Sequence, residues 1–256
     1  MTPSKTHLVL IPSYNPGDKG VETVRAARQF WAPVWVVTDG STDGSPEKLQ
    51  ALAGSDPAIR VLVRAHNGGK GAAVLDGLLE AERAGFTHAL TMDSDGQHPA
   101  HCIPEFMGAS SAAPQAMILG VPLFDASAPA IRVGGRKISN WMVNVETLGG
   151  GIQDALFGFR VYPITSLISV MRSTRFMRRF DFDAEAVVRL SWKGIRAINL
   201  AAPVRYFSQL EGGISHFNYW RDNVLLTSMY LRLAIGSVIR IPTLLAHRAN
   251  RNAKGG

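Results

Sequence analysis

Four short apolar segments, each ending in a polar loop, constrain the fold of this chain more than any other feature. They are residues 7–12, 34–37, 59–63 and 89–92. Continuous apolar runs of this length are typical of strands buried on both faces of a parallel sheet. Between them lie helical patterns, such as Val74, Leu75, Leu78 and Leu79. The alternation predicts an α/β fold with a mostly parallel central sheet flanked by helices.

The loops after these four strands are polar. They begin at Ser13, Asp39, Arg64 and Asp93. Because ligands of open α/β sheets bind beyond the carboxyl ends of the strands, these loops predict one binding site on one rim of the sheet.

The fourth loop carries two acids one residue apart, Asp93 and Asp95, followed by Gln97. Carboxylate and amide oxygens are hard ligands that suit Mg²⁺ or Mn²⁺, and those ions in turn suit phosphate oxygens. Asp, Ser and Gly are also common turn formers. Taken alone, the loop fits either a metal site or an Asp-rich turn.

The pattern changes after Pro122. A helix is expected over 132–148, with Arg132, Arg136 and Asn140 on one of its faces. Further strands are expected at 116–120, 157–161 and 195–204, and a helix at 184–192. Residues 223–245 are apolar but interrupted by basic residues. This tail predicts an amphipathic helix, or a broken pair, that lies on a membrane surface or packs on the domain itself.

Composition narrows the classes of function. The 256 residues carry a net charge of +7 and one cysteine, so an internal disulfide is impossible and a reducing, cytoplasmic setting is expected. Basic residues are not interleaved with aromatic ones, which argues against a nucleic-acid partner. No uninterrupted apolar run reaches the roughly 18 residues of a spanning helix. The sequence Gly68-Gly69-Lys70-Gly71 lacks the Ser or Thr of a P-loop and the third glycine of a dinucleotide fingerprint.

Several ordered motifs resemble family 2 glycosyltransferases of the GT-A fold. The first four are Ile-Pro-Ser-Tyr-Asn (11–15), Val-Thr-Asp-Gly-Ser-Thr-Asp-Gly (37–44), Asn-Gly-Gly-Lys-Gly (67–71) and Met-Asp-Ser-Asp-Gly-Gln-His-Pro (92–99). Downstream, Gln-Asp-Ala-Leu-Phe-Gly-Phe-Arg (153–160), Phe-Asp-Ala-Glu (182–185) and Val-Arg-Tyr (204–206) are similar to the dolichyl-phosphate mannose synthase-like branch. The resemblance covers roughly residues 7–210.

The resemblance implies a nucleotide-sugar donor, a UDP- or GDP-sugar, and Mg²⁺ or Mn²⁺. The residues it assigns to donor binding are Pro12, Tyr14, Asn15, Asp39, Arg64, Lys70 and Asp93, and those it assigns to the metal are Asp93, Asp95 and Gln97. The family usually has two acids before Gly40. Here Thr38 replaces the first, which leaves Asp39 to contact the nucleoside alone.

The acceptor decides the mechanism of the implied inverting transfer. A hydroxyl acceptor needs a general base, whereas a polyprenyl phosphate is already ionised and needs cations to position it. The resemblance assigns acceptor binding to Arg132, Arg136, Ser139 and Arg205. Asp154 is the favoured carboxylate base, with Asp183 and Glu185 as alternatives, and Asp95, Asp154 and Arg136 form the expected catalytic set.

The resemblance also divides the chain. Residues 1–210 are expected to form the catalytic domain, with a nucleotide-binding part near 7–122 and an acceptor part near 123–210. Residues 211–256 form the tail. A protein with this tail is expected to lie peripherally on the cytoplasmic face of a membrane. Transfer to a hydroxyl of a glycolipid or polysaccharide precursor, nucleotidyl transfer, and non-catalytic binding of a nucleotide sugar remain the alternatives.

Overall fold

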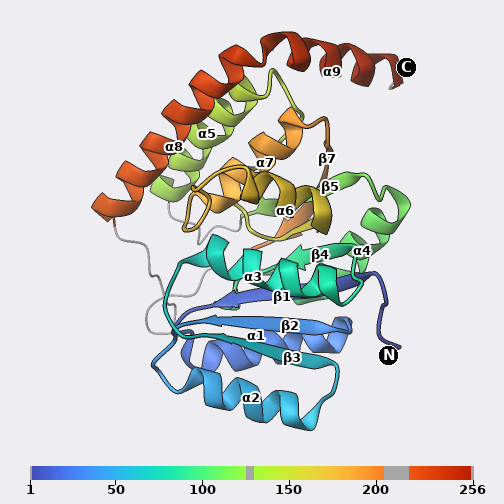
Figure 1. The fold of residues 1–256 in the computed structure, drawn as a ribbon, viewed down its shortest axis with the longest axis vertical. Helices are drawn as coiled ribbons and strands as arrows, with labels where there is room; N and C mark the ends of the chain where they lie inside the picture. Colours follow the sequence, from blue (N-terminus) through green and yellow to red (C-terminus); the bar gives the residue numbers. More distant parts are fainter. Residues whose placement is uncertain (1, 125–129, 205–218, 255–256) are drawn as a thin grey trace.

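A single sheet organises the molecule. The computed structural model describes residues 2–124, 130–204 and 219–254. Within them, seven strands lie in the order β3-β2-β1-β4-β6-β5-β7 (Figure 1). Their bounds are β1 His7–Ser13, β2 Val34–Asp39, β3 Ile59–Arg64, β4 His88–Thr91, β5 Ala116–Leu123, β6 Arg160–Pro163 and β7 Arg196–Pro203. Only β6 runs antiparallel to its neighbours β4 and β5 in this described part of the chain, so the predicted mostly parallel α/β fold is confirmed.

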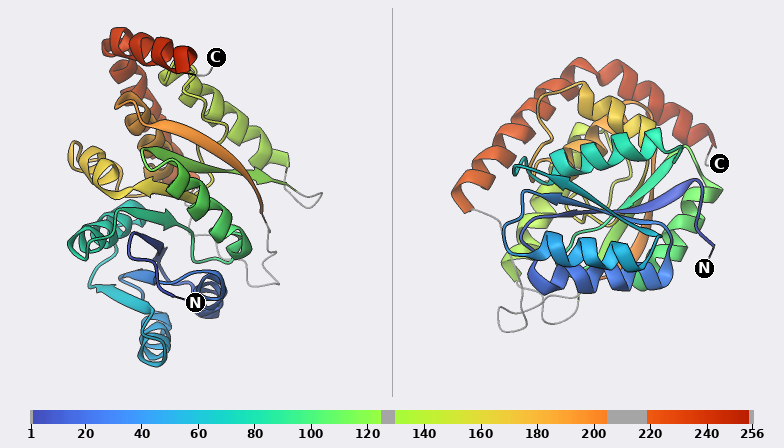
Figure 2. Two further views of the ribbon diagram at one scale, coloured as in Figure 1. Left: turned by 90° about the vertical axis from the view of Figure 1, so that its right-hand side faces the viewer. Right: turned by 60° about the horizontal axis from the view of Figure 1, so that its bottom comes forward.

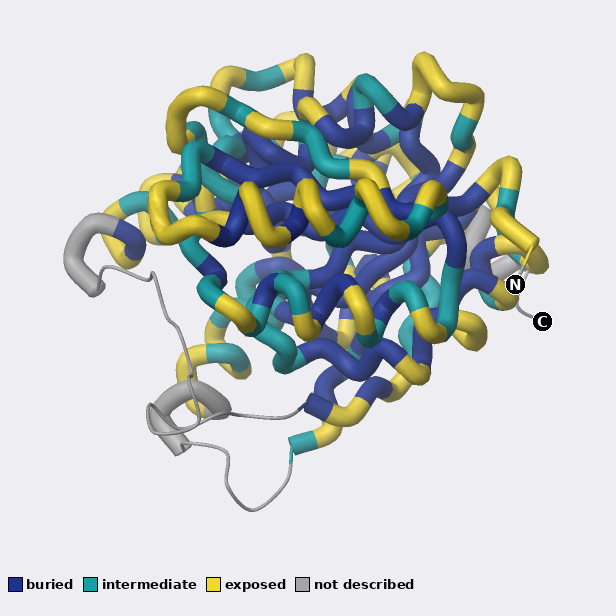
Figure 3. The backbone as a smooth tube through the Cα atoms, turned by 90° about the horizontal axis from the view of Figure 1, so that it is seen from below, coloured by how far each residue is buried: buried dark blue, intermediate teal, exposed yellow. Residues whose placement is uncertain are grey.

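Helices cover both faces of the sheet, as Figure 2 shows. Successive side chains of a strand point to opposite faces, so Val9 and Ile11 enter one core while Leu8 and Leu10 enter the other. The first core lies under α1 (Gly17–Phe30), α2 (Ser45–Ser55) and α4 (Ile103–Ala112), which follows the short 3₁₀ helix η1 (Ala100–Cys102). The second lies under α3 (Lys70–Arg83), α6 (Ile164–Arg172) and α7 (Phe182–Trp192). In Figure 3 the buried strands run between these layers.

Three further helices, α5 (Ala130–Glu146), α8 (Tyr219–Ile239) and α9 (Ile241–Lys254), lie together at the far end from α2 (Figure 1). The tail is thus the predicted broken pair, bent by 74°. It packs on the domain through Met229 and Leu233, which are fully buried. None of the described helices is by itself long and apolar enough to cross a membrane, although α8 and α9 together meet that test of length and composition.

One predicted strand begins later than expected. The strand expected at 157–161 is β6, which starts at Arg160. The backbone N–H groups of Leu156 and Phe157 donate to Asp154 Oδ1, at 2.9 and 2.7 Å. They are therefore held in a turn and are not available to a β ladder. Helices α4 and α6 were not anticipated from the apolar pattern.

Candidate active site at the carboxyl ends of the strands

The first two loops of the rim are joined by Asn15. Its backbone N–H donates to Ser41 Oγ at 3.0 Å, and its side-chain oxygen accepts from the Thr42 N–H at 2.8 Å. Asn15 adopts a φ of 42°, in the left-handed region that asparagine tolerates better than most residues. Pro12 lies within β1, beside Val37 of β2. The predicted donor residues of these two loops are therefore brought together.

Asp39 organises the third loop. Its buried carboxylate accepts from the backbone N–H groups of Gly68 at 2.9 Å and Gly69 at 2.7 Å, and it pairs with Arg64. Arg64 also donates from Nε to Asp76 at 2.7 Å. The sequence predicted Asp39 as a contact for the nucleoside. Here most of its accepting capacity already serves the loop that leads into Lys70.

Lys70 bridges two carboxylates from opposite halves of the chain. Its Nζ lies 2.7 Å from Asp93 Oδ1 and 2.7 Å from Asp183 Oδ2. Burial alone would lower the pKa of Lys70, but the charges of Asp183 and Asp93 outweigh it and raise the pKa well above its usual range. Burial likewise pushes the pKa of Asp93 upward, and the Lys70 ammonium more than offsets this and lowers it.

Asp95 and His98, in and directly after the fourth loop, are both shifted toward their neutral forms. Burial and the neighbouring charge of Asp93 raise the pKa of Asp95 to about 6. The backbone N–H of Gln97 donates to Asp95 Oδ1 at 3.0 Å. Burial lowers the pKa of His98 to about 4, and His98 Nδ1 accepts from the Asp93 backbone N–H at 2.9 Å. His98 is therefore a neutral framework group whose Nε2 carries the proton.

These residues fit a divalent cation. The charge of Asp93 makes Asp95 harder to ionise, and a bound cation would relieve this effect. Within the described ranges, no cluster of three or more His, Cys, Asp or Glu side chains could hold a metal unaided. The remaining ligands would then be Gln97, donor phosphate oxygens and water, as is usual for ions that bind through one or two carboxylates.

Three of the four predicted acceptor residues, Arg132, Arg136 and Ser139, lie on α5. Arg136 Nη1 lies 2.6 Å from Asp154 Oδ1, and the Asn140 side chain donates to Asp154 Oδ2 at 3.4 Å. Asp154 is only 2% exposed. Ser139 is half-buried on the same helix. Arg132 lies in α5 but its side chain is outside what the structure describes, as is the whole of Arg205.

Sequence reasoning missed how the two halves of the site are joined. It considered Asp183 only as a base, and it gave Arg160 no role. Arg160 is fully buried and donates to the backbone oxygens of Asp183 at 2.5 Å and Asp154 at 3.3 Å. The sequence carried no signal for this link, because only the folded chain shows that Lys70 is a buried charge that needs counter-charges.

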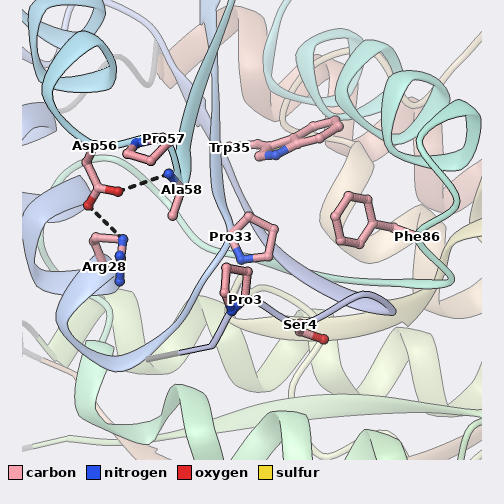
Figure 4. Close-up of a pocket in the computed structure, with 9 residues that line it drawn as sticks. All are labelled: Pro3, Ser4, Arg28, Pro33, Trp35, Asp56, Pro57, Ala58 and Phe86. Atoms are coloured by element: carbon pink, nitrogen blue, oxygen red, sulfur yellow. Dashed lines mark hydrogen bonds and ion pairs between the residues drawn. The ribbon is translucent and has the colours of Figure 1, made fainter.

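A pocket of about 450 Å³ lies at the opposite edge of the sheet (Figure 4). Trp35, at the start of β2, and Phe86 contribute to its lining. Its charged lining residues, Arg28 and Asp56, already pair with each other at 2.8 Å. The charged groups of this pocket are therefore already paired, and it is a weaker candidate for a catalytic site than the rim that carries Lys70 and Asp93.

Two named proteins are similar to this chain in sequence. Polyprenol monophosphomannose synthase of Mycolicibacterium smegmatis is 27% identical over 228 residues, which cover 83% of this chain and 81% of that protein. Dolichol-phosphate mannosyltransferase of Saccharomyces cerevisiae is 39% identical over 69 residues, which cover 27% of this chain and 25% of that enzyme. The match thus covers about a quarter of the length of the yeast relative.

Solved structures share the fold. Glucosyl-3-phosphoglycerate synthase of Mycobacterium tuberculosis, in complex with Mn²⁺, UDP and glucosyl-3-phosphoglycerate, matches with a TM-score of 0.59 at 18% identity over 93% of this chain and 80% of its own. A mannosyltransferase of Pyrobaculum calidifontis, in complex with GDP-Man and Mn²⁺, matches with a TM-score of 0.57 at 16% identity over 100% of this chain and 78% of its own. Both are glycosyltransferases of the GT-A fold. The sequence profile of glycosyl transferase family 2 matches residues 8–167, more than half of this chain, which therefore belongs to that family and is a glycosyltransferase with the GT-A fold.

Proposed function

We propose that this glycosyltransferase moves a sugar from a UDP- or GDP-sugar to a polyprenyl phosphate or another lipid-linked phosphate, with inversion at the anomeric carbon. A phosphate oxygen of the acceptor attacks that carbon. The bond between the carbon and the donor diphosphate breaks, and the nucleoside diphosphate leaves with the electron pair. The relatives named for polyprenol and dolichol phosphates support this acceptor class.

The pairing of Asp154 with Arg136 is the observation that carries the proposal. Asp154 Oδ1 accepts from Arg136 at 2.6 Å and from two backbone N–H groups. Both oxygens of this carboxylate therefore already accept hydrogen bonds, and the carboxylate orients the guanidinium of Arg136. The other two candidate bases are also paired: Asp183 with Lys70, and Glu185 with Arg189 and Arg232. An acceptor that is already ionised needs no base.

The donor would lie across the rim formed by the first four loops. Asp93, Asp95 and Gln97 would hold Mg²⁺ or Mn²⁺, and the bound ion would supply positive charge for the leaving diphosphate. Asn15, Tyr14 and Pro12 border the nucleoside, while Asp39 and Arg64 fix the loop that presents Lys70. Arg136 holds the acceptor phosphate, together with Arg132, Ser139 and Arg205. Arginine forks match the geometry of phosphate oxygens.

Transfer to paired acceptors tests the proposal. Purified protein with Mn²⁺ and radiolabelled GDP-mannose or UDP-glucose would be offered a polyprenyl phosphate or the matching polyprenol in detergent. We expect an organic-soluble labelled product with the phosphate only. Arg136→Gln should lower transfer about 100-fold, since one arginine–phosphate pair positions the nucleophile. Lys137→Gln, an exposed neighbour on α5, is the control. Transfer to the polyprenol, abolished by Asp154→Asn, would contradict the proposal and establish the hydroxyl alternative.

We also propose that α5, α8 and α9 rest on the cytoplasmic face of a membrane. Each carries large apolar side chains that are more than half exposed: Ile138, Trp141, Val145, Leu231, Ile235, Val238, Ile239 and Leu245. The exposed Arg240 and Arg248 accompany them. An apolar face with basic residues is typical of helices that lie in a lipid interface. Because α5 also carries Arg136, such contact would bring the acceptor phosphate to the site.

Sedimentation with anionic liposomes tests the membrane contact. We expect the full chain to sediment, and the double variant Trp141→Asp with Ile235→Asp to stay in the supernatant. Val63→Asp removes an exposed apolar side chain from β3, away from these helices, and should leave sedimentation unchanged. A wild-type chain that remained in the supernatant would contradict this part of the proposal.

A further inference from the structure

The Lys70 ammonium has a second counter-ion that the donor and metal assignments do not explain. Asp183 lies on the first turn of α7, and its Oδ2 is 2.7 Å from Lys70 Nζ. Among the described residues its Oδ1 is buried and has no hydrogen-bond partner. The Asp183 side chain is thus committed to Lys70.

The backbone around this pair is fixed. Arg160, which is fully buried, donates to the Asp183 carbonyl oxygen at 2.5 Å. On the other side, the Gly69 N–H donates to Asp39 and the Ala72 N–H donates to the Arg178 carbonyl oxygen at 3.0 Å. The backbone at both ends of the Lys70–Asp183 pair is therefore held by hydrogen bonds.

Gly158 leaves the space that the Lys70 ammonium occupies. A Cβ at this position would lie 2.6 Å from Lys70 Nζ and 3.4 Å from Asp183 Oδ1. The ammonium group therefore lies where any residue other than glycine at 158 would place a side chain. Three elements distant in sequence, the start of α3, the loop before β6 and the start of α7, together define the position of one charge.

We propose that Asp183 is a positioning residue, which retains Lys70 at the rim when Asp93 exchanges the ammonium for a divalent cation. The inference rests on the proposed function. A lysine ammonium has three N–H groups, and two of them face Asp93 and Asp183 here. Once Asp93 binds a cation, Lys70 keeps Asp183 and has N–H groups to donate to the donor diphosphate. Without Asp183, the positive charge of a cation bound at Asp93 would repel the Lys70 ammonium from the rim.

The proposal predicts that Lys70→Gln strengthens the binding of Mn²⁺ and weakens the binding of the nucleotide. With Mn²⁺ alone, monitored by electron paramagnetic resonance, Lys70→Gln should bind the ion about tenfold more tightly, because a competing positive charge is gone. With GDP or UDP and saturating Mn²⁺, Lys70→Gln and Asp183→Asn should each weaken nucleotide binding about tenfold by calorimetry.

A double-mutant cycle separates positioning from a general structural role. If Asp183 acts through Lys70, adding Asp183→Asn to Lys70→Gln should change nucleotide affinity by less than about twofold. Glu80→Gln removes a carboxylate from the same helix as Lys70, where it pairs with Arg60 and Arg83, and should leave both affinities unchanged. Thermal unfolding of each variant reports its folding.

Additive effects of Lys70→Gln and Asp183→Asn on nucleotide affinity, or no effect of Asp183→Asn in the wild-type background, would overturn this inference alone. A wild-type chain that bound neither nucleotide would overturn the proposed function and this inference together. Failure of this inference alone, with sugar transfer retained, is therefore distinguishable from failure of the proposed function.

Discussion

Replacing Gly158 by alanine tests whether the position of the Lys70 charge matters. The added Cβ would stand 2.6 Å from Lys70 Nζ and 3.2 Å from Asp93 Oδ2. Favourable contacts between non-bonded heavy atoms begin near 3.5 Å, so the ammonium must move by about 1 Å. We expect this movement to lengthen at least one of its two 2.7 Å ion pairs. Misplacement by about 1 Å near a reacting group lowers catalysis by about 100-fold.

The backbone at Gly158 should accept alanine. Gly158 is not among the residues with positive φ, and its carbonyl oxygen accepts from Thr91 Oγ1 at 2.9 Å. The unfolded chain also loses conformational freedom when glycine becomes alanine, which favours the folded state by about 0.4–1 kcal/mol. We therefore expect the Tm of Gly158→Ala to change by only a few degrees while kcat/KM falls about 100-fold.

Steady-state transfer and differential scanning calorimetry measure the two effects. Gly108→Ala is the matched control, because Gly108 is exposed on α4 and a Cβ there meets nothing within 4 Å. This control should keep full activity and gain about 0.5–1 kcal/mol of stability. If Gly158→Ala retained kcat/KM within about threefold of wild type, the reasoning about the Lys70 position would be refuted.

Three other outcomes are expected. Asp95→Ala should lose Mn²⁺-dependent donor hydrolysis or transfer, and unchanged turnover would discard the metal assignment. Burial and the neighbouring His88 lower the pKa of His7 to about 4. The contribution of neutral His7 to stability is therefore present above pH 6.5 and is lost as the pH falls to 4. Chemical denaturation should show that the wild type loses up to about 3 kcal/mol of stability relative to His7→Gln over that range of pH. Burial and Glu185 raise the pKa of Glu146 to about 8, so the protonated form of Glu146 stabilises the fold at low pH. Between pH 4.5 and 8 the wild type should lose up to about 4 kcal/mol of stability relative to Glu146→Gln. For either residue, parallel profiles of stability against pH for variant and wild type would contradict the assignment.

The sequence predicted the first half of the rim well because its information is local. Buried parallel strands require long apolar runs, and polar residues begin where those runs stop. Ser13, Asp39, Arg64 and Asp93 could therefore be placed on one edge without any tertiary contact. The same locality explains the failure at β6, since the turn at Phe157 depends on the side chain of Asp154 and is not visible in an apolar pattern.

The second half of the site could not be derived in this way. Lys70 and Asp183 are 113 residues apart, and only the packing of α3 against α7 brings them together. The sequence likewise favoured Asp154 as a carboxylate base, with Asp183 and Glu185 as alternatives, without showing what each one contacts. Their partners distinguish them, and those partners are set by tertiary structure. A buried charge needs a counter-charge, but the sequence shows neither that Lys70 is buried nor which residue pairs with it.

The first turn of α7 shows how closely the catalytic rim and the tail are linked. Asp183 faces Lys70, while Glu185, two residues later and fully buried, pairs with Arg189 at 2.7 Å and with Arg232 of α8 at 3.1 Å. The Arg232 guanidinium also stacks on Phe176, 3.5 Å from the ring centre. Removing one partner of a buried charge leaves that charge uncompensated. The tail helix is therefore part of the structure that fixes α7, and through Asp183 it bears on the position of Lys70.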